Sequence, residues 1–264
     1  MRHSARRLFY LPRDVLDTLL GRRDAYTPPK GMYLIGGDFS EVGQEFLNHF
    51  ITLGGLQPHH RVLDLGCGVG RLAVPLTHYL NARGSYHGLD IVPKGIAWCK
   101  KKISRCHSNF SFDLADIRND EYNPRGACDA GNFVFPYEND FYDFVFSVSV
   151  FSHMLPEGFE NYMAEVGRVL KPGGITMHSQ YLVNADAVRC MQLPASAINF
   201  KHDCGHYRIV DTYVPENKVA YDEAYVREIY SRNGLDIVSP LHYGAWCGRD
   251  DALNHQDIIV AFKR

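Results

Sequence analysis

The chain has 264 residues, of which 45% are hydrophobic and 22% are charged, a composition typical of globular proteins and unlike that of collagen or a disordered chain. Lys and Arg number 28 and Asp and Glu number 30, so the formal charge of -2 gives no electrostatic reason to expect nucleic acid or an anionic membrane as a partner. No apolar run approaches the roughly 20 residues that span a bilayer, and the first residues lack the apolar segment of a secretory signal. Seven cysteines without a C-x-x-C pair suggest neither a zinc site nor a redox motif, and we expect a cytoplasmic protein.

Residues 1–39 are predicted to form a basic arm ahead of the folded domain. Residues 1–30 hold seven Lys or Arg against three Asp, a balance also found in organelle-targeting segments. The apolar residues that follow Pro12, with Gly21 as a stop, favour instead a short amphipathic helix.

Residues 40–264 are predicted to form one α/β domain, opened by a helix that Ser40 caps and that Gly54 and Gly55 end. The pattern then predicts strand 61–65, helix 70–80, strand 85–91, helix 93–104, strand 109–115, strand 143–150, helix 157–170 and strand 174–182. Near the end we expect helix 222–233, a strand near 235–240 and a final strand 257–262, with the last two strands as an antiparallel edge. The βαβ order predicts a parallel sheet covered by helices on both faces.

Two long segments, 118–140 and 183–221, interrupt this alternation. Irregular connections of such length in a compact domain are usually functional lids or disordered. Both segments carry aromatic residues, so we expect them to be ordered insertions, the second as an irregular connection between a strand and a helix.

The strongest local signal is an apolar strand that runs into Gly66-Cys67-Gly68-Val69-Gly70, at a strand-to-helix switch where open α/β sheets bind ligands. Arg71 stands where a dinucleotide fingerprint has its third glycine, and Asp64 stands where it would repel a pyrophosphate and attract a cation. The pocket therefore suits an ammonium or a sulfonium. Asp90 closes the next strand, where a carboxylate accepts hydrogen bonds from both hydroxyls of a ribose.

The chain resembles the class I S-adenosylmethionine-dependent methyltransferases in the run VLDLGCGVGRLAVPL, with GLDI at the next strand, LADI at the third and FYDFVFSVSVFSHM at the fourth. A later run is similar to the R-x-L-K-P-G-G segment of that family, namely EVGRVLKPGGITMHSQYL. The motifs cover residues 40–182, and residues 222–262 resemble the family by element order only. The resemblance implies a seven-stranded, mostly parallel, doubly wound Rossmann-like sheet and S-adenosylmethionine as the cofactor.

The resemblance also implies a cofactor site. Its residues would be Asp64, Gly66, Cys67 and Gly68 at the methionine end, Asp90 and Ile91 at the ribose and adenine, Asp116 and Ile117 at the adenine amine and ring, and Ser147 at the end of the fourth strand. Cys67 would contribute its main chain, and Arg71 would bind a carboxylate or only solvent.

His153 follows the fourth strand, beside the place where such enzymes hold the transferred methyl group. A neutral imidazole with a pKa near ~6.5 takes a proton from a hydroxyl or an amine at neutral pH. Alternatively, His153 hydrogen-bonds a loop and shapes the pocket. Weaker candidates, without a metal-binding pattern among them, are His178, His202, His206, Tyr207 and His242.

The residues at the end of the fourth strand also exclude some classes of methyl acceptor. Residues 147–150 lack the D/N/S-P-P-aromatic run of amino-methylating DNA enzymes, and neither an acidic cluster nor a paired-Glu loop is present. We therefore expect metal-independent methyl transfer to an oxygen or nitrogen of a small molecule, under lids formed by residues 1–39, 118–140 and 183–221. Aromatic walls for this pocket would be Tyr33, Phe135, Tyr137, Tyr207, Tyr213 and Trp246.

Two other functions stay open at this point. An NAD(P)-dependent oxidoreductase also has a carboxylate like Asp90 that binds a ribose at the end of the second strand. A non-catalytic S-adenosylmethionine-binding subunit would have the glycine loop but no acceptor pocket. The sequence predicts neither the acceptor's identity nor the oligomeric state.

Overall fold

The computed structural model describes residues 3–32, 36–250 and 252–264, with the main chain alone for residues 3–8. Tyr33, expected to line the acceptor pocket, lies outside the described residues. The chain divides into two compact units, Met1–Ala115 and Asp116–Arg264.

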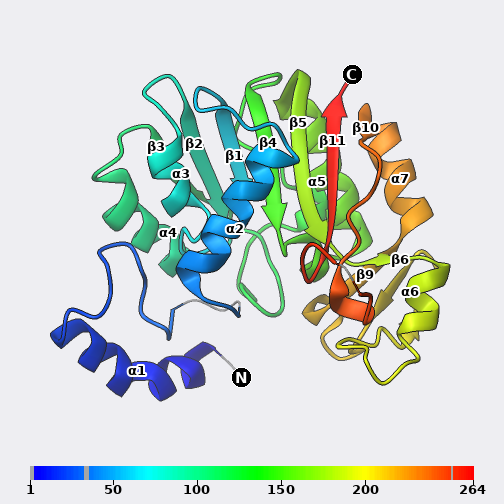
Figure 1. Cartoon of the computed structure of the whole chain (residues 1–264), viewed down its shortest axis with the longest axis horizontal. Coiled ribbons are helices and arrows are strands. Elements are labelled where there is room, and N and C mark those ends of the chain that lie inside the picture. Colours follow the sequence, from blue (N-terminus) through cyan, green and yellow to red (C-terminus); the bar gives the residue numbers. More distant parts are fainter. Residues whose placement is uncertain (1–2, 33–35, 251) are drawn as a thin grey trace. The chain divides into compact units, whose positions relative to one another are not determined.

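The strands form a seven-stranded sheet in the order β10-β11-β5-β4-β1-β2-β3 and a smaller sheet in the order β6-β9-β8-β7 (Figure 1). The strands of the large sheet are β1 Arg61–Leu65, β2 Ser85–Asp90, β3 Phe110–Leu114, β4 Tyr142–Val148, β5 Leu170–Gln180, β10 Leu235–Ile237 and β11 Asp257–Lys263. β11 is antiparallel to both β5 and β10, whereas the β1–β2, β2–β3 and β4–β5 pairs are parallel. The predicted seven-stranded, mostly parallel α/β sheet with an antiparallel edge is confirmed.

Four helices belong to the first unit. They are α1 His3–Leu19, α2 Phe39–Thr52, α3 Ala73–Tyr79 and α4 Pro93–Cys99, and α4 continues as the π-helical turn Lys100–Ser104. The cap of α2 is Asp38 rather than Ser40, because its Oδ1 accepts hydrogen bonds from the N–H groups of Ser40 and Glu41 at 2.9 and 3.1 Å. The predicted start of α1 after Pro12 is also wrong, since Pro12 lies inside a helix that begins nine residues earlier.

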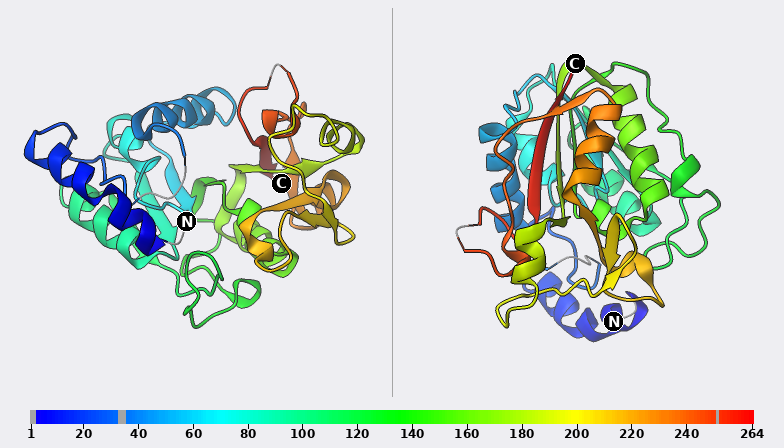
Figure 2. Two further views of the ribbon diagram at one scale, coloured as in Figure 1. Left: turned by 90° about the horizontal axis from the view of Figure 1, so that it is seen from below. Right: turned by 90° about the vertical axis from the view of Figure 1, so that its right-hand side faces the viewer.

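The second unit carries α5 Pro156–Val169 and α7 Glu223–Arg232, which lie side by side next to β11 in the right-hand view of Figure 2. They approach closely at Gly167, where an added Cβ would come within 2.8 Å of the Asn233 carbonyl oxygen. The fold therefore needs a residue without a side chain at this crossing.

Arg168 of α5 anchors the insertion 118–140. Its guanidinium donates to the carbonyl oxygens of Phe135 and Tyr137 at 3.0 and 2.8 Å, and the Glu165 carboxylate accepts from the Phe135 N–H at 2.7 Å. Arg168 and Glu165 are themselves paired at 2.6 Å. Phe135, expected in the acceptor pocket, is 1% exposed and belongs to the core instead.

The insertion 183–221 is not an irregular connection, because it folds into most of a small sheet. Its elements and their neighbours are β6 Leu182–Val183, α6 Ala185–Cys190, β7 His202–Asp203, β8 Tyr207–Ile209 and β9 Val219–Asp222. Tyr181, Phe200 and Trp246 pack together in a buried hydrophobic cluster beneath α6 and β9. Trp246 therefore serves this core and is no wall of an open pocket, whereas Tyr213 is 94% exposed.

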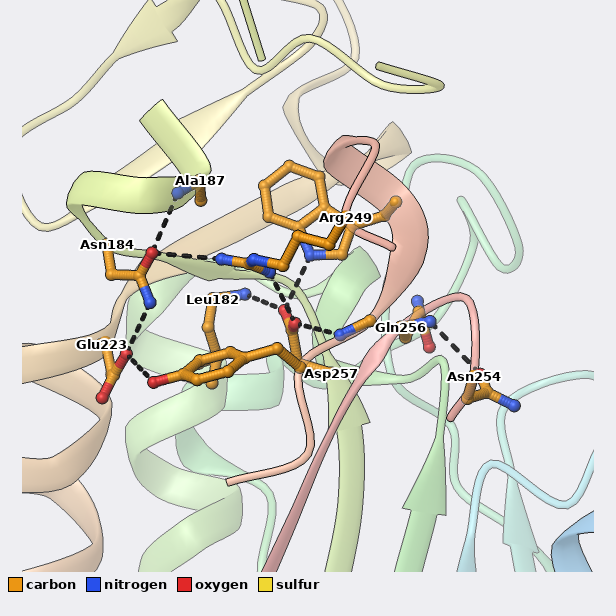
Figure 3. A network of polar contacts seen from close by, with 11 residues as sticks. Leu182, Asn184, Ala187, Glu223, Arg249, Asn254, Gln256 and Asp257 are labelled. Carbon is orange, nitrogen blue, oxygen red and sulfur yellow. Dashed lines mark hydrogen bonds and ion pairs between the residues drawn. The ribbon is translucent and has the colours of Figure 1, made fainter. Parts of the chain in front are cut away.

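Asp257 fastens this cluster to the large sheet (Figure 3). Its Oδ2 accepts from the Leu182 N–H at 2.6 Å and from the Trp246 indole at 2.8 Å, and its Oδ1 accepts from the Gly244 N–H at 2.7 Å. Arg249 adds an ion pair at 3.3 Å and reaches on to Asn184 Oδ1 at 3.1 Å. One buried carboxylate thus satisfies donors from two segments, the nearby residues 244–249 and the distant Leu182.

We expect Asp257→Ala to lower the free energy of unfolding by about 2–4 kcal/mol, because three buried N–H groups and a guanidinium lose their acceptor. Urea unfolding followed by circular dichroism measures this loss. The matched control is Asp236→Ala, which removes a surface pair to Arg264 at 3.4 Å and should cost under about 1 kcal/mol. Equal losses in the two variants would contradict the role given to Asp257.

Candidate functional site

The glycine loop follows β1 directly and turns through main-chain conformations that favour glycine. Gly66 and Gly68 have φ angles of 84° and 57°. The N–H groups of Gly66 and Cys67 both donate to the Leu89 carbonyl oxygen, at 2.7 and 3.2 Å, which ties the loop to the end of β2. The loop is therefore held at the carboxyl edge of β1 and β2.

Asp90, the last residue of β2, holds this loop through one carboxylate oxygen, while the other accepts a hydrogen bond from a residue just after the strand. Oδ2 accepts from the Gly68 N–H and Oδ1 from the Val92 N–H, each at 2.7 Å. Burial raises the pKa of Asp90, while these hydrogen bonds favour its ionised form. The half-buried Ile91 follows immediately, so the carboxylate predicted for the ribose lies beside the apolar residue predicted for the adenine.

Asp64 lies under the same loop and has an incomplete set of partners. It is 1% exposed, and the Tyr86 hydroxyl donates to its Oδ2 at 2.5 Å. Its Oδ1 is buried and accepts no hydrogen bond from the described residues. Burial, with the nearby charge of Asp90 as a smaller cause, raises the pKa of Asp64 to about 8. A cation placed at Oδ1 would satisfy this oxygen and favour the ionised carboxylate.

Cys67 and Arg71 have structural partners of their own. The Cys67 side chain is 5% exposed, and burial raises the pKa of its thiol well above the usual range. Arg71 donates from Nη1 to the Gly36 carbonyl oxygen at 2.9 Å, so it ties the segment before α2 to the glycine loop. This contact adds a third interpretation to the two that the sequence offered for Arg71.

Gly95 belongs to the site, although the sequence reasoning missed it. A Cβ built on Gly95 of α4 would come within 2.4 Å of the Gly68 carbonyl oxygen. Only glycine lets α4 approach the loop this closely. A glycine inside a predicted helix, at a position without a turn, was the available signal.

In the second unit, Asp116 and Ile117 open the insertion 118–140. Ile117 is 2% exposed and forms a bridge with Cys128, whose N–H donates to the Asp116 carbonyl oxygen at 3.0 Å. The Asp116 residue itself is exposed. The pair therefore presents a polar side chain at the surface above a fixed apolar residue, the two properties expected of an adenine contact.

Ser147 is wholly buried, and its hydroxyl lies 2.7 Å from His178 Nδ1. His178 Nε2 lies 2.6 Å from the Thr176 hydroxyl, which itself donates to the Val145 carbonyl oxygen at 3.0 Å. Thr176 must then accept from Nε2–H, so Ser147 donates to Nδ1. Burial lowers the pKa of His178 to about 3, so the imidazole in this series of hydrogen bonds is neutral.

His153 lies in the short 3₁₀ turn Phe151–His153 after β4. Its Nδ1 lies 3.1 Å from the Glu216 carbonyl oxygen, which only accepts hydrogen bonds, so the proton is on Nδ1 and the lone pair is on Nε2. The Tyr122 hydroxyl is 3.5 Å from Nε2. Burial is the main reason that the pKa of His153 falls to about 4, well below the expected ~6.5. At neutral pH the ring is therefore neutral, with its basic atom fixed.

Both insertions meet at His153. Asn119 Nδ2 donates to the His153 carbonyl oxygen at 3.2 Å, and Asn119 Oδ1 accepts from the Tyr122 N–H at 2.9 Å. From the other insertion, Glu216 accepts from the Asp120 N–H through its carboxylate at 2.7 Å, besides its carbonyl contact with His153. The sequence reasoning missed Asn119, Tyr122 and Glu216, because nothing in the sequence relates residues almost one hundred positions apart.

The weaker histidine candidates lie elsewhere. His206 stacks on Tyr225 with ring centroids 4.2 Å apart, and His178 belongs to the core chain described above. His202 pairs with Ile209 in the small sheet. Among the described residues, no group of three or more His, Cys, Asp or Glu is placed to hold a metal ion.

The structure thus groups the predicted residues within each unit. In the first unit, Asp64, the glycine loop, Asp90 and Ile91 come together at one strand edge. In the second, His153 contacts both insertions, and Asp116 and Ile117 directly precede the insertion 118–140.

Comparison with known proteins assigns these motifs to a family. Residues 62–174 match the family described as a methyltransferase domain. The phthiotriol/phenolphthiotriol dimycocerosates methyltransferase of Mycobacterium leprae is 35% identical over 114 residues, which are 43% of this chain and 35% of that protein. The sterol 24-C-methyltransferase erg6 of Schizosaccharomyces pombe is 30% identical over 133 residues, which are 50% of this chain and 30% of that protein. The chain thus spans about a third of the length of these curated relatives.

A solved structure gives the fold over nearly the whole chain. The 1,6-didemethyltoxoflavin-N1-methyltransferase of Burkholderia thailandensis, solved with S-adenosylhomocysteine bound, covers 97% of this chain and 88% of its own, with 16% identity and a TM-score of 0.52. At this identity the likeness concerns the fold alone. The family match identifies residues 62–174 as a methyltransferase domain, and the glycine loop and the shared fold support the class I, S-adenosylmethionine-dependent type.

Proposed function

We propose that this protein transfers a methyl group from S-adenosylmethionine to an oxygen or nitrogen of a small molecule, without a metal ion. The observation that carries the proposal is the buried Oδ1 of Asp64, an unsatisfied acceptor beneath a glycine loop that Asp90 clasps. S-adenosylmethionine offers the matching groups, namely an ammonium, a ribose with two hydroxyls and a positively charged sulfur that donates the methyl. A nicotinamide dinucleotide would instead bring a pyrophosphate toward Asp64, so the oxidoreductase alternative is disfavoured.

The residues of the first unit would divide the binding of the cofactor. Asp64 would ionise and hold the ammonium, and Asp90 would accept hydrogen bonds from the ribose hydroxyls while it keeps the loop in place. Ile91, together with Asp116 and Ile117 from the second unit, is proposed for the adenine, and Ser147 for a contact at the end of β4. Because the Ser147 hydroxyl is engaged by His178, we assign this contact to its main chain.

His153 is proposed to accept the proton that the acceptor loses. A hydroxyl oxygen that has received a methyl group is positively charged and strongly acidic, so even an imidazole with a pKa of about 4 is basic enough to take its proton. The fixed tautomer leaves Nε2 unprotonated for this step, with the Tyr122 hydroxyl 3.5 Å away, and the main-chain anchor from Glu216 holds the ring in one orientation. The two insertions would close over the acceptor and exclude water.

The names of the relatives bear on the acceptor's chemistry. Two of them name a phthiotriol dimycocerosate and a sterol, both predominantly apolar, which supports an apolar small molecule as the acceptor. The sterol enzyme's name specifies a carbon as the methylated atom, so a test must register methyl transfer to carbon as well.

The decisive experiment incubates the protein with S-adenosylmethionine that carries a deuterated methyl group and with fractionated pools of small molecules, sterols and lipids. Mass spectrometry then identifies any product that gains the label and locates the methyl on oxygen, nitrogen or carbon. We expect labelled product with and without EDTA, because the described residues form no metal-binding group. Cofactor binding without turnover in any pool would favour the non-catalytic subunit, and turnover that EDTA abolishes and magnesium restores would contradict metal independence.

Asp90→Ala should weaken the binding of S-adenosylhomocysteine by on the order of 1–3 kcal/mol, because the ribose hydroxyls lose a charged acceptor. Isothermal titration calorimetry measures the change. The matched ligand is a deoxyribose analogue that lacks these hydroxyls, for which wild type and variant should differ much less. An equal loss with both ligands would assign Asp90 to loop structure alone.

Asp64→Asn should affect stability and binding in opposite directions. In the free protein the pKa of Asp64 is about 8, above the value of 3.8 for an unperturbed carboxyl, so the folded state keeps a proton that the unfolded state loses between pH 4 and 8. Stability due to Asp64 therefore falls as the pH rises through this range, and Asn should raise the free energy of unfolding at pH 8 by about 1–3 kcal/mol.

The same substitution should weaken S-adenosylhomocysteine binding. It should also remove the rise in affinity that wild type shows from pH 6 to 8, where Asp64 must lose its proton to pair with the ammonium. Thermal denaturation and calorimetry over this pH range test both effects. A variant that binds as tightly as wild type at every pH would rule out the ammonium contact.

His153→Ala should lower kcat by roughly 10²–10⁴ and change KM much less, if Nε2 takes the proton. Wild-type kcat should be constant from pH 6 to 8 and fall only toward an acidic midpoint near 4, because burial keeps the ring neutral. The variant should lack this acidic limb. Steady-state rates across pH 4–8 measure both, and an unchanged acidic limb in the variant would leave His153 a positioning role.

A further inference from the structure

Helix α1 is attached to the first unit by its polar side. The Asp14 carboxylate is 7% exposed and accepts from the N–H groups of Lys30 and Gly31, at 2.7 and 3.0 Å. Asp17 lines the same surface hollow as Trp98 of α4. These contacts orient the helix about its axis.

The apolar side of the same helix faces away from the protein. We call it the apolar arc, and its residues are Phe9, Leu11, Val15, Leu16, Leu19 and Leu20. All six are exposed, Leu19 by 78% and Phe9 by 68%. At about 100° per residue, the five that lie within the helix cover an arc of about 160° opposite Asp14 and Asp17. A helix that only packs on the protein's own core turns its apolar face inward and its polar face toward solvent.

The segment around the arc is basic, although the whole chain is not. Residues 1–23 contain six arginines and two aspartates, whereas the chain as a whole has a formal charge of -2. Asp14 is turned inward, and Asp17 pairs with Arg13 at 3.8 Å. Arg13 and Arg22 are exposed beside the arc. The surface therefore combines exposed apolar side chains with a local excess of positive charge.

We propose that α1 lies in the interface of an anionic lipid bilayer, with the apolar arc inserted among the acyl chains and with Arg13 and Arg22 at the phosphate level. Interfacial helices have this combination of a broad apolar face and flanking cations. No helix among the described residues has the length and apolarity to cross a bilayer. This proposal replaces the expectation, drawn from the net charge, that no membrane is involved.

The width of the arc favours lipid over a second copy of the chain. A helix-to-helix seam uses the a and d positions of each heptad and is narrower than an arc of about 160°. Opposite charges draw the basic segment to an anionic surface, whereas two copies of the same basic segment would repel each other. Figure 1 places α1 beyond the carboxyl ends of β1 to β3, within the first unit, so the bilayer would lie on the side of the glycine loop.

Co-sedimentation of the full chain with vesicles tests the proposal. The vesicles are equimolar phosphatidylglycerol and phosphatidylcholine in one arm and phosphatidylcholine alone in the other. We expect wild type to sediment with the anionic vesicles, at least fivefold less with the neutral ones, and Leu16→Glu/Leu19→Glu to lose binding by at least tenfold. The matched control is Val238→Glu/Leu253→Glu, which alters two exposed apolar residues outside α1 and should bind as wild type does.

Thermal denaturation of each variant shows whether it remains folded, which we expect because both altered side chains on α1 are exposed. Light scattering coupled to gel filtration, without lipid, reports the alternative partner. Three results would overturn the proposal: wild type that does not sediment with anionic vesicles, Leu16→Glu/Leu19→Glu that sediments equally, or equal binding to neutral vesicles. A wild-type dimer that the same variant dissociates would assign the arc to a second copy instead.

Discussion

The clasp between Asp90 and the glycine loop is the constraint on which the first unit depends. A glycine-rich loop is flexible by itself, and here the Gly68 N–H donates to Asp90 Oδ2 at 2.7 Å, while the Val92 N–H fixes the other oxygen of the same carboxylate at 2.7 Å. The Leu89 carbonyl oxygen and the close approach of Gly95 hold the same loop from two further sides. The loop thus has its shape before any ligand binds, so ligand binding does not have to supply the free energy of ordering it.

In the second unit, hydrogen bonds that involve main-chain groups likewise hold His153 in place. The ring is fixed by the Glu216 carbonyl and the residue by Asn119, so neither contact depends on a charged partner. Burial then determines the proton affinity of the imidazole. Because each insertion supplies one contact, displacing either would alter the orientation of the ring.

Much of the first unit followed from local sequence. The apolar run of β1, the glycine turn and the carboxylates at positions 64 and 90 are short-range signals, and each was placed correctly at its strand edge. The cap of α2 was assigned to Ser40 instead of Asp38, because both residue types accept main-chain hydrogen bonds equally well. Pro12 predicts a helix boundary because proline lacks an N–H, yet it lies inside α1.

The second unit was less predictable, because its contacts join distant parts of the chain. The small sheet pairs Leu182 with Tyr221 across almost forty residues, and its strands are two to four residues long, too short for a periodic signal. The prediction of Trp246 as a pocket wall is wrong, because aromatic residues suit both pockets and cores and this one is fully buried. Only the buried acceptor on Asp257 decides between them, and no local pattern reveals that partner.

The burial of the Cys67 thiol bears on whether the protein can be methylated by its own cofactor. A thiolate is a strong nucleophile, and the S-adenosylmethionine proposed for the same loop carries an electrophilic methyl group. Burial keeps the Cys67 sulfur protonated, with its pKa well above the ordinary range. A loop built in this way would carry its own sulfur next to a methyl donor without being alkylated by it, so the donor would persist until an acceptor arrives.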